Sequence, residues 1–360
     1  MKKILVVCAA ISTLLCLPLR AQEADDAGST GVGFSIIPRL DLSPEFTDGK
    51  GEFTLGNSSL YTLFEGNITE NLSFSVANHW MSFWGTDPLM DDTKALYNHT
   101  FWRSDTNNWL DWAYLSYEAG PWTFTLGKNT MLTGGYEYDE YDWNVHPTLA
   151  SSFWNYFQCY QWGGRIGYSF TEDHTISMEM TTSPYGERPF SSGRYALSVG
   201  WDGTMGPITT KWSYSAIQRE DDWTHLFYLG TRFEADYLTL TLDLSNKIGH
   251  EDIILENGFS AQFSMGFQIS DHFEAIGKIG MENFEQSQAK EPYYDSSRHE
   301  WVQPGPISTS YKSEFQIGAA LHWFPLRDSK DLRVHATAAH NSFLDTATLS
   351  VGVLYNLNLL

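Results

Sequence analysis

Residues 110–144, LDWAYLSYEAGPWTFTLGKNTMLTGGYEYDEYDWN, contain two alternating runs, a tight turn and a long polar loop. Apolar residues at 122, 124 and 126 alternate with Thr or Gly at 123, 125 and 127, which indicates a strand with two different environments. Gly120-Pro121 between the two runs is typical of a hairpin turn. The loop that follows has acidic residues but no Lys or Arg between Lys128 and Asn155. A short turn at one end and a long polar loop at the other form the repeating unit of a transmembrane β-barrel.

The composition favours the same architecture. Aromatic residues make up 15% of the 360 residues, and charged residues make up only 18%, below the roughly 25% of soluble domains. The mean hydropathy is nevertheless negative, as expected for a barrel with an apolar outside and a polar inside. The formal net charge of −22 excludes the strongly basic surface of a nucleic-acid-binding protein.

The N-terminus has the pattern of a secretory signal peptide. Lys2 and Lys3 precede a short apolar run, and Ala21 supplies a small residue for cleavage. We expect residues 1–21 to be the signal peptide, residues 22–30 a flexible periplasmic lead-in, and residues 31–360 one transmembrane barrel. Without the signal peptide, Cys159 is the only cysteine, so no disulfide is expected within the chain.

The alternation continues to the end of the chain and predicts about sixteen antiparallel strands. The first covers about residues 33–41 and the last about residues 347–359. Seven short turns are expected to alternate with eight longer loops, periplasmic and extracellular respectively, and an even strand count places both chain ends on one side. A soluble β-sandwich would not sort its connections by length, and no repeat indicates a propeller.

The polar face of each strand predicts the side chains that line the barrel interior. We expect the inward basic residues to be Arg39, Arg165, Arg194, Lys211, Arg232, Lys247, Lys278, Lys312 and Arg333. We expect the inward acidic residues to be Glu179, Asp243, Glu274, Glu282 and Glu314, with Glu65 undecided. Sixteen strands enclose more space than side chains can fill, which leaves an aqueous channel. A slightly basic lumen favours anions, although these charges can equally serve to pair with each other and solvate the wall.

The loop over residues 129–157 favours cations instead of anions. If it folds into the barrel, its four acids would form a negative constriction: Glu137, Asp139, Glu140 and Asp142. The alternative is an ordinary solvated surface loop.

Motifs for catalysis and metal binding are absent from the sequence. The histidines show neither the HExxH pattern nor another tight metal spacing, and no GxSxG elbow occurs. We therefore predict no catalytic residues, no metal site and no cofactor. A barrel hydrolase with Ser and His on neighbouring wall positions remains a minor alternative.

Residues 113–128 (AYLSYEAGPWTFTLGK) resemble a hairpin of the phosphate-selective porin O and P family. Residues 134–142 (GGYEYDEYD), 152–160 and 183–190 (SPYGERPF) resemble the version found in outer-membrane porins of Bacteroides-type bacteria. The resemblance implies a sixteen-stranded barrel that assembles as a homotrimer. In that family a ladder of pore arginines and lysines gives phosphate specificity, and no residue of this sequence is assigned to that ladder.

Together these features predict an outer-membrane porin. It would be a passive channel for small hydrophilic solutes, with a lean towards phosphate-like anions, embedded in outer-membrane lipid. The alternative is a non-conducting barrel whose acidic, aromatic loops bind a glycan or a surface partner, with Tyr136, Tyr138, Tyr141 and Trp143 as the candidate contacts.

Overall fold

The computed structural model describes most of the predicted barrel. The described residues are 31–47, 50–54, 58–82, 110–133, 135–139, 149–151, 160–184, 193–219, 222–249, 258–288, 293–295, 300–302, 308–342 and 346–360. The expected signal peptide and lead-in, residues 1–30, lie outside them.

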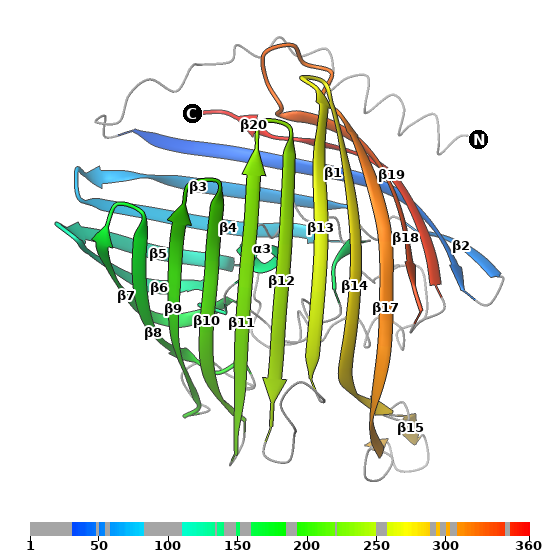
Figure 1. Ribbon diagram of the computed structural model, residues 1–360, viewed down its shortest axis with the longest axis horizontal. Coiled ribbons are helices and arrows are strands. Elements are labelled where there is room, and N and C mark those ends of the chain that lie inside the picture. Colours follow the sequence, from blue (N-terminus) through cyan, green and yellow to red (C-terminus); the bar gives the residue numbers. More distant parts are fainter. Residues whose placement is uncertain are drawn as a thin grey trace.

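The fold is a closed antiparallel β-barrel (Figure 1). Its sheet consists of β1 (Val32–Thr47), β2 (Lys50–Thr54), β3 (Ser59–Thr69), β4 (Leu72–Ser82), β5 (Leu110–Ala119), β6 (Trp122–Thr130), β7 (Tyr160–Thr171), β8 (His174–Thr182), β9 (Tyr195–Met205), β10 (Ile208–Arg219), β11 (Asp222–Ala235), β12 (Leu238–Ile248), β13 (Phe259–Ser270), β14 (Phe273–Gln288), β17 (Ser308–Trp323), β18 (Leu332–Asn341), β19 (Thr346–Tyr355) and β20 (Leu357–Asn358). Two strands are short additions, because β2 folds back on β1 and β20 continues β19 past Asn356. The remaining sixteen form the wall, which confirms the predicted fold and strand count.

The ring closes because the first strand pairs on both of its edges. Residues 32–39 of β1 pair with β3, and residues 39–47 pair with β19. Every wall strand therefore has two hydrogen-bonded neighbours, so no backbone edge is left open to the surroundings. A separate hairpin, β15 (Tyr293–Asp295) with β16 (Glu300–Val302), lies in the connection between β14 and β17.

The two ends of the barrel differ. One end, here called the turn end, carries seven short turns together with the start of β1 and the end of β20, as predicted. Six of these turns have two residues each, and the seventh covers residues 324–331. The other end, the loop end, holds the remaining connections. One of them departs from the prediction of longer loops: β10 ends at Arg219 and β11 begins at Asp222. These two strands keep their pairing along their whole length, so little chain is left between them.

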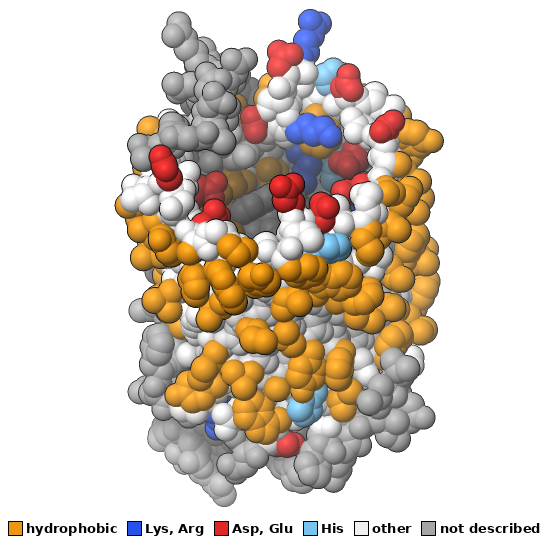
Figure 2. Space-filling view, turned by 60° about the vertical axis from the view of Figure 1, so that its left-hand side comes forward, with side chains coloured by type: hydrophobic (Ala, Val, Ile, Leu, Met, Phe, Trp, Pro, Cys, Tyr) orange, Lys and Arg blue, Asp and Glu red, His pale blue; other side chains and the backbone are white. Residues whose placement is uncertain are grey.

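The predicted division into two faces is visible along the wall. In β9 the side chains of Tyr195, Leu197 and Val199 are exposed, whereas Ala196 and Ser198 between them are buried. The exposed apolar side chains form a belt around the outside (Figure 2). Leu126 in β6 is 70% exposed and Met178 in β8 is 65% exposed, which suits side chains surrounded by hydrocarbon rather than water.

Leu126→Arg tests this assignment of faces. An arginine at the centre of a lipid-facing strand costs about 2–4 kcal/mol, so the free energy of unfolding in lipid vesicles should fall by that amount. The matched control is Thr123→Arg in the same strand, which points to the interior and should cost much less. Equal losses for both variants would contradict the inside-out arrangement.

The inner face is not polar everywhere, which corrects the sequence-based expectation. Ile37, Tyr61, Ala77 and Leu354 all point inward and form a buried apolar cluster where the first and last strands meet. Trp112 packs on this cluster, with its ring centroid 6.0 Å from that of Tyr61. Alternation placed these residues on the inner face correctly. Near the seam between the first and last strands, however, that inner face carries enough aliphatic and aromatic residues to form a small internal core.

A polar cluster next to this core ties the closing strands together. The Asp41 carboxylate accepts a hydrogen bond from Arg39 Nε at 2.5 Å and pairs with His335 Nε2. Ser350 on β19 donates to the same carboxylate at 3.4 Å, and the Asp41 N–H donates to Ser58 Oγ at 2.9 Å. Asp41 thus connects β1 with β18, β19 and the start of β3, and it neutralises Arg39.

Candidate functional site

The described part of the connection from β6 to β7, residues 131–159, lies inside the barrel. We call this connection the constriction loop. Its described segments are residues 131–133, 135–139 and 149–151, and they include the one-turn helix α3 (Tyr136–Asp139). These segments contact inward side chains of β8, β10, β11, β12, β14 and β17. The part of the loop that the structure describes therefore lies inside the ring.

The first anchor holds the loop where it leaves β6. Arg165 donates from Nε and Nη2 to Oε1 of Glu179, at 3.1 and 2.8 Å. The other Glu179 oxygen accepts the N–H of Leu132 at 2.6 Å, and Arg165 also donates to the carbonyl of Thr130 at 2.6 Å. The ion pair thereby binds the last residue of β6 and supplies an acceptor for the N–H of Leu132 in the loop.

The second anchor is Asp243 on β12. Its Oδ1 and Oδ2 accept the N–H groups of Tyr136 and Glu137, both at 3.2 Å. These N–H groups are at the start of α3, where a helix has no internal acceptors for them. A buried carboxylate at this position supplies the acceptors and fixes the helix against the wall.

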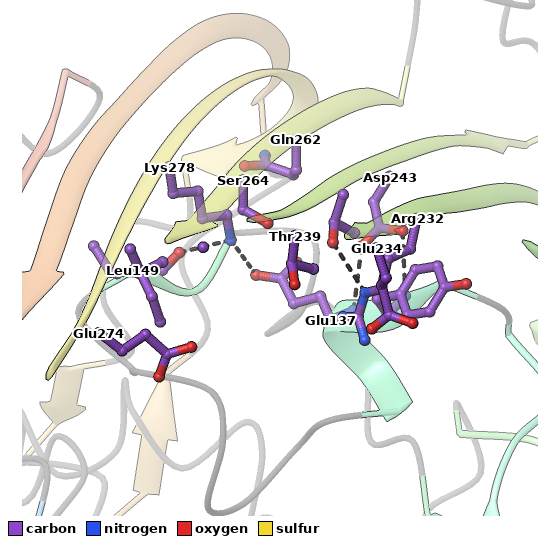
Figure 3. Close-up of a pocket in the computed structure, with 14 residues that line it drawn as sticks. Glu137, Leu149, Arg232, Glu234, Thr239, Asp243, Gln262, Ser264, Glu274 and Lys278 are labelled. Carbon is purple, nitrogen blue, oxygen red and sulfur yellow. Dashed lines mark hydrogen bonds and ion pairs between the residues drawn. The ribbon is translucent and has the colours of Figure 1, made fainter. Parts of the chain in front are cut away.

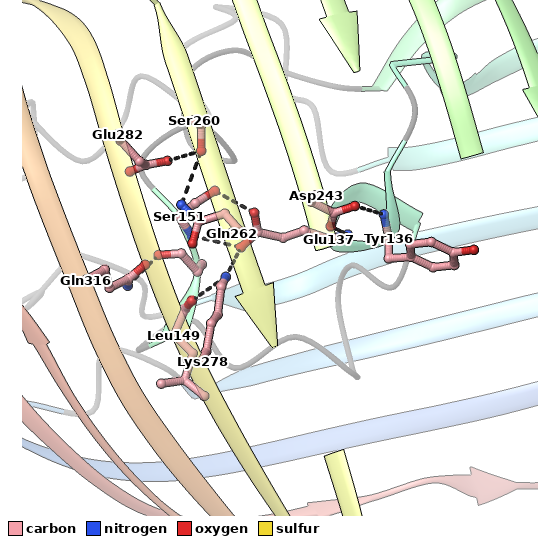
Figure 4. Close-up of polar contacts among 11 residues, drawn as sticks. Tyr136, Glu137, Leu149, Ser151, Asp243, Ser260, Gln262, Lys278, Glu282 and Gln316 are labelled. Atoms are coloured by element: carbon pink, nitrogen blue, oxygen red, sulfur yellow. Dashed lines mark hydrogen bonds and ion pairs between the residues drawn. The ribbon is translucent and has the colours of Figure 1, made fainter. Parts of the chain in front are cut away.

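The third anchor is a buried ion pair at the middle of the loop (Figure 4). Lys278 Nζ on β14 donates to Glu137 Oε1 at 2.5 Å and to the carbonyl of Leu149 at 2.7 Å. The Ser151 N–H and hydroxyl also donate to Glu137, at 2.8 and 2.5 Å. Gln316 on β17 donates to the carbonyl of Ala150 at 2.9 Å. Glu137 therefore joins two separate segments of the loop to the wall.

Glycines on the inner wall make room for the loop. An added Cβ would lie 3.0 Å from the side chain of Leu132 at Gly200, 2.7 Å from the Cα of Gly135 at Gly230, and 2.2 Å from Leu149 Cδ2 at Gly318. Gly135 itself has φ +82°, and a Cβ there would lie 1.8 Å from the Tyr228 ring. The loop can approach the wall this closely only because these positions lack side chains.

Tyr136 connects the loop to the basic residues of β10 and β11. The Cζ of Arg232 lies 4.0 Å from the centre of the Tyr136 ring, a distance at which the guanidinium is attracted to the ring. The Tyr136 hydroxyl bonds to Thr209 at 2.5 Å. Burial is the main reason why the pKa of this hydroxyl lies above its usual value, so the phenol is neutral. Tyr136 was a candidate surface contact for a glycan, and the structure instead places it inside the ring.

The basic residues predicted to line the interior occupy the inner face wherever the structure describes them. Those on described strands are Arg39, Arg165, Lys211, Arg232, Lys247, Lys278 and Arg333, and Arg194 immediately precedes β9. The side chain of Lys312 lies outside the described part. Ion pairs join Arg39 to Asp41 at 2.5 Å, Arg165 to Glu179 at 2.8 Å, Lys278 to Glu137 at 2.5 Å and Lys211 to Asp202 at 3.7 Å. These pairs neutralise much of the positive charge that the sequence analysis assigned to the lumen.

The predicted acidic residues of the strands also occupy the inner face wherever the structure describes them. Glu179, Asp243, Glu274 and Glu282 point inward, and Glu282 is almost fully buried, with an acceptor oxygen 3.0 Å from Ser260 Oγ. Glu137 is buried in its ion pair instead of facing open water as a constriction charge would. The side chains of Asp139 and Glu314, and residues Glu140 and Asp142, lie outside the described part.

A cavity of about 290 Å³ lies between the constriction loop and the wall formed by β11 to β14 (Figure 3). Tyr136, Glu137 and Leu149 bound it on the loop side. Glu234 and Glu274 bound it near the turn end, and Figure 3 shows these two carboxylates at opposite sides of the cavity. The cavity lies on the side of the loop that faces the turn end.

Acidic side chains surround the barrel mouth at the turn end, where Figure 2 shows a hollow. Three basic residues lie in the short turns or within two residues of them: Arg327, Lys330 and Arg333. Ten acidic residues lie in the same zone: Glu70, Glu118, Glu172, Asp173, Glu234, Asp236, Asp271, Glu274, Asp328 and Asp331. This mouth therefore carries a negative potential.

Comparison with solved structures agrees with this geometry. A variant of OmpT, an outer membrane protein of Vibrio cholerae, that lacks one loop superposes with a TM-score of 0.55 at 8% identity, over 90% of this chain and 99% of the other. The outer membrane channel DcaP of Acinetobacter baumannii gives a TM-score of 0.56 at 10% identity, over 92% and 100%. A mutant of the Rh. blastica porin gives 0.51 at 12% identity, over 90% and 100%.

The fold is that of bacterial outer-membrane barrels. No protein-family model matches the chain, and no curated protein sequence matches it. Membership of the phosphate-selective porin family therefore stays a prediction.

Within the described residues, no group of three or more His, Cys, Asp or Glu side chains is arranged to hold a metal ion. No helix among them is long and apolar enough to span a membrane.

Sequence reasoning found the charged anchors but not their partners. Alternation identified Asp243, Lys278 and Glu179 as inward. Their partners in the loop are backbone N–H groups for Asp243 and Glu179 and the Glu137 carboxylate for Lys278, and each partner is at least 40 residues away in the sequence. The glycines at 200, 230 and 318 all occupy inward positions, and that pattern is a sequence feature that could have indicated a loop against the wall.

Proposed function

We propose that this protein is a passive diffusion channel of a bacterial outer membrane. The observation that supports this most is the constriction loop, held inside a closed sixteen-stranded ring by buried anchors. An inward loop that narrows the bore and leaves part of it open would let small hydrophilic solutes pass and exclude larger ones. The short turns would then face the periplasm and the longer loops the exterior. The homotrimer implied by the family resemblance stays a prediction.

The test is conductance in planar bilayers, together with swelling of vesicles in sugars of increasing size. We expect discrete open steps and a swelling rate that falls sharply with solute size. Purified, folded barrels that insert but give no current would overturn the proposal and would favour the non-conducting rival, a barrel that acts through its loops.

The charge preference of the channel needs a separate proposal. The sequence analysis favoured anions such as phosphate, on the basis of inward Arg and Lys residues. Four of these residues are paired with acids, and the mouth at the turn end has ten acidic residues against three basic ones. Acidic rings favour cations, so we propose a modest preference for cations over anions.

Reversal potentials in a potassium chloride gradient measure this preference. At neutral pH we expect the sign that corresponds to cation selectivity. The preference should decline as the pH approaches about 4, near the ordinary pKa of a glutamate carboxyl. Replacing Glu70, Glu118 and Glu172 together by glutamine should lower it at neutral pH. Anion selectivity of the unmodified channel would restore the original prediction.

A further inference from the structure

The wall behind the cavity is a regular array of inward side chains. The strand register aligns Glu234 on β11 with Thr239, Gly266 and Ile276 on the next three strands. Glu274 follows one inward position nearer the turn end on β14. Neighbouring strands lie about 4.8 Å apart, so the backbones that carry the two carboxylates are about 14 Å apart across the array.

The basic side chains of the cavity are already engaged. Lys278 is held by Glu137 and by the carbonyl of Leu149. Arg232 donates from Nε to Thr241 at 3.1 Å and stacks on the Tyr136 ring. The positive charges of Lys278 and Arg232 therefore bind the loop, and the solute contacts proposed below do not involve them.

The remaining hydrogen-bonding capacity of the cavity consists largely of acceptors. Glu234 has no ion pair or hydrogen bond to its side chain in the described structure. Glu274 uses Oε2 for His322, at 3.0 Å. Gln262 lines the same cavity, is only 4% exposed, and its Oε1 has no hydrogen-bond partner. The carboxylate oxygens of Glu234 and Oε1 of Glu274 are therefore the acceptors that favour a ligand with N–H donors.

We propose that this cavity is a binding subsite for linear organic polycations such as polyamines. One ammonium group pairs with Glu234 and a second with Glu274, while the intervening chain lies along Thr239 and Ile276. The hydroxyl of Ser264 accepts a further N–H donor. The inference rests on the proposed channel function in one respect: a polycation that enters the subsite from the turn end should obstruct the current, and this effect requires a conducting barrel.

Two measurements on the full-length barrel test the subsite. The first is the concentration of spermine that halves the single-channel current, with spermine added to one chamber at a time. The second is the binding of spermine to detergent-solubilised protein by calorimetry, which needs no conduction. We expect binding, block from one side only, and a weaker effect of the shorter putrescine, because it cannot reach both carboxylates.

Variants of the two carboxylates locate the site. Glu234→Gln and Glu274→Gln should each raise the half-blocking concentration about threefold, and the double variant about tenfold, the effect of losing one or two exposed ion pairs. The matched control is Glu65→Gln, an exposed acid at the same end on β3, across the ring from β11. It should change the half-blocking concentration little.

The outcomes separate this inference from the proposed function. Binding of spermine by a barrel that carries no current would overturn the channel but retain the subsite. A conducting barrel that neither binds spermine nor is blocked by it would overturn the subsite alone. An effect of Glu65→Gln as large as that of Glu234→Gln would show attraction by the acidic mouth as a whole, and would overturn the site.

Discussion

Gly230→Val is expected to displace the constriction loop from the wall and to raise the single-channel conductance. A Cβ at position 230 would lie 2.7 Å from the Cα of Gly135 and 2.8 Å from Oδ1 of Asp243. The first neighbour is backbone and the second is the carboxylate that binds the start of α3, so neither can move without breaking that anchor. Overpacking of this kind costs about 1–3 kcal/mol, comparable with the hydrogen bonds it would disrupt. We expect the conductance to increase by roughly half or more as the bore widens.

The matched control for this substitution is Gly277→Val. Gly277 is on β14, and nothing lies within 4 Å of the position where its Cβ would be. This variant should fold and conduct like the unmodified protein. If Gly230→Val leaves the conductance unchanged while the barrel stays folded, the described loop segments do not limit the flow of ions.

Lys278→Met is expected to lower the free energy of unfolding by about 3–5 kcal/mol, because it leaves the buried carboxylate of Glu137 without its counter-charge. The carbonyl of Leu149 loses its donor at the same time. The channel should also become noisier, since the middle of the loop is released from β14. Urea unfolding in lipid vesicles and open-channel current fluctuations measure the two effects.

A double-mutant cycle isolates the ion pair. The variant with both Glu137→Gln and Lys278→Met removes both charges, and it should recover about 1–3 kcal/mol relative to the sum of the single changes. Lys330→Met, an exposed lysine in the turn before β18, serves as the control and should stay within about 0.5 kcal/mol. Additive single effects would show that Glu137 and Lys278 do not stabilise each other.

The strands could be predicted from the sequence because the fold depends on a local pattern. Side chains alternate across a strand, so each run such as residues 122–127 reports both that it is a strand and which face meets lipid. Turn residues such as Gly120-Pro121 mark where the chain reverses. Closure follows because a sheet in hydrocarbon has no other way to satisfy its edge backbone groups.

The candidate site could be predicted only in part. The alternation placed Asp243 and Lys278 on the inner face, but an inward position does not tell whether a charge faces water or holds a loop. The acidic constriction was inferred from the composition of the loop, whereas Glu137 is buried against Lys278. Its partners Ser151 and Lys278 come from another segment of the loop and from a strand 141 residues away, and no local pattern links them.

The sequence by itself determined the barrel, the number of wall strands and the face of most wall side chains, because these follow from a period of two residues that every strand repeats. Only the tertiary structure decided that the described segments of the loop after β6 lie inside the ring, that wall glycines receive them, and that acids pair with several of the inward basic residues. These features depend on contacts between residues far apart in the chain, and such contacts exist only once the ring has closed.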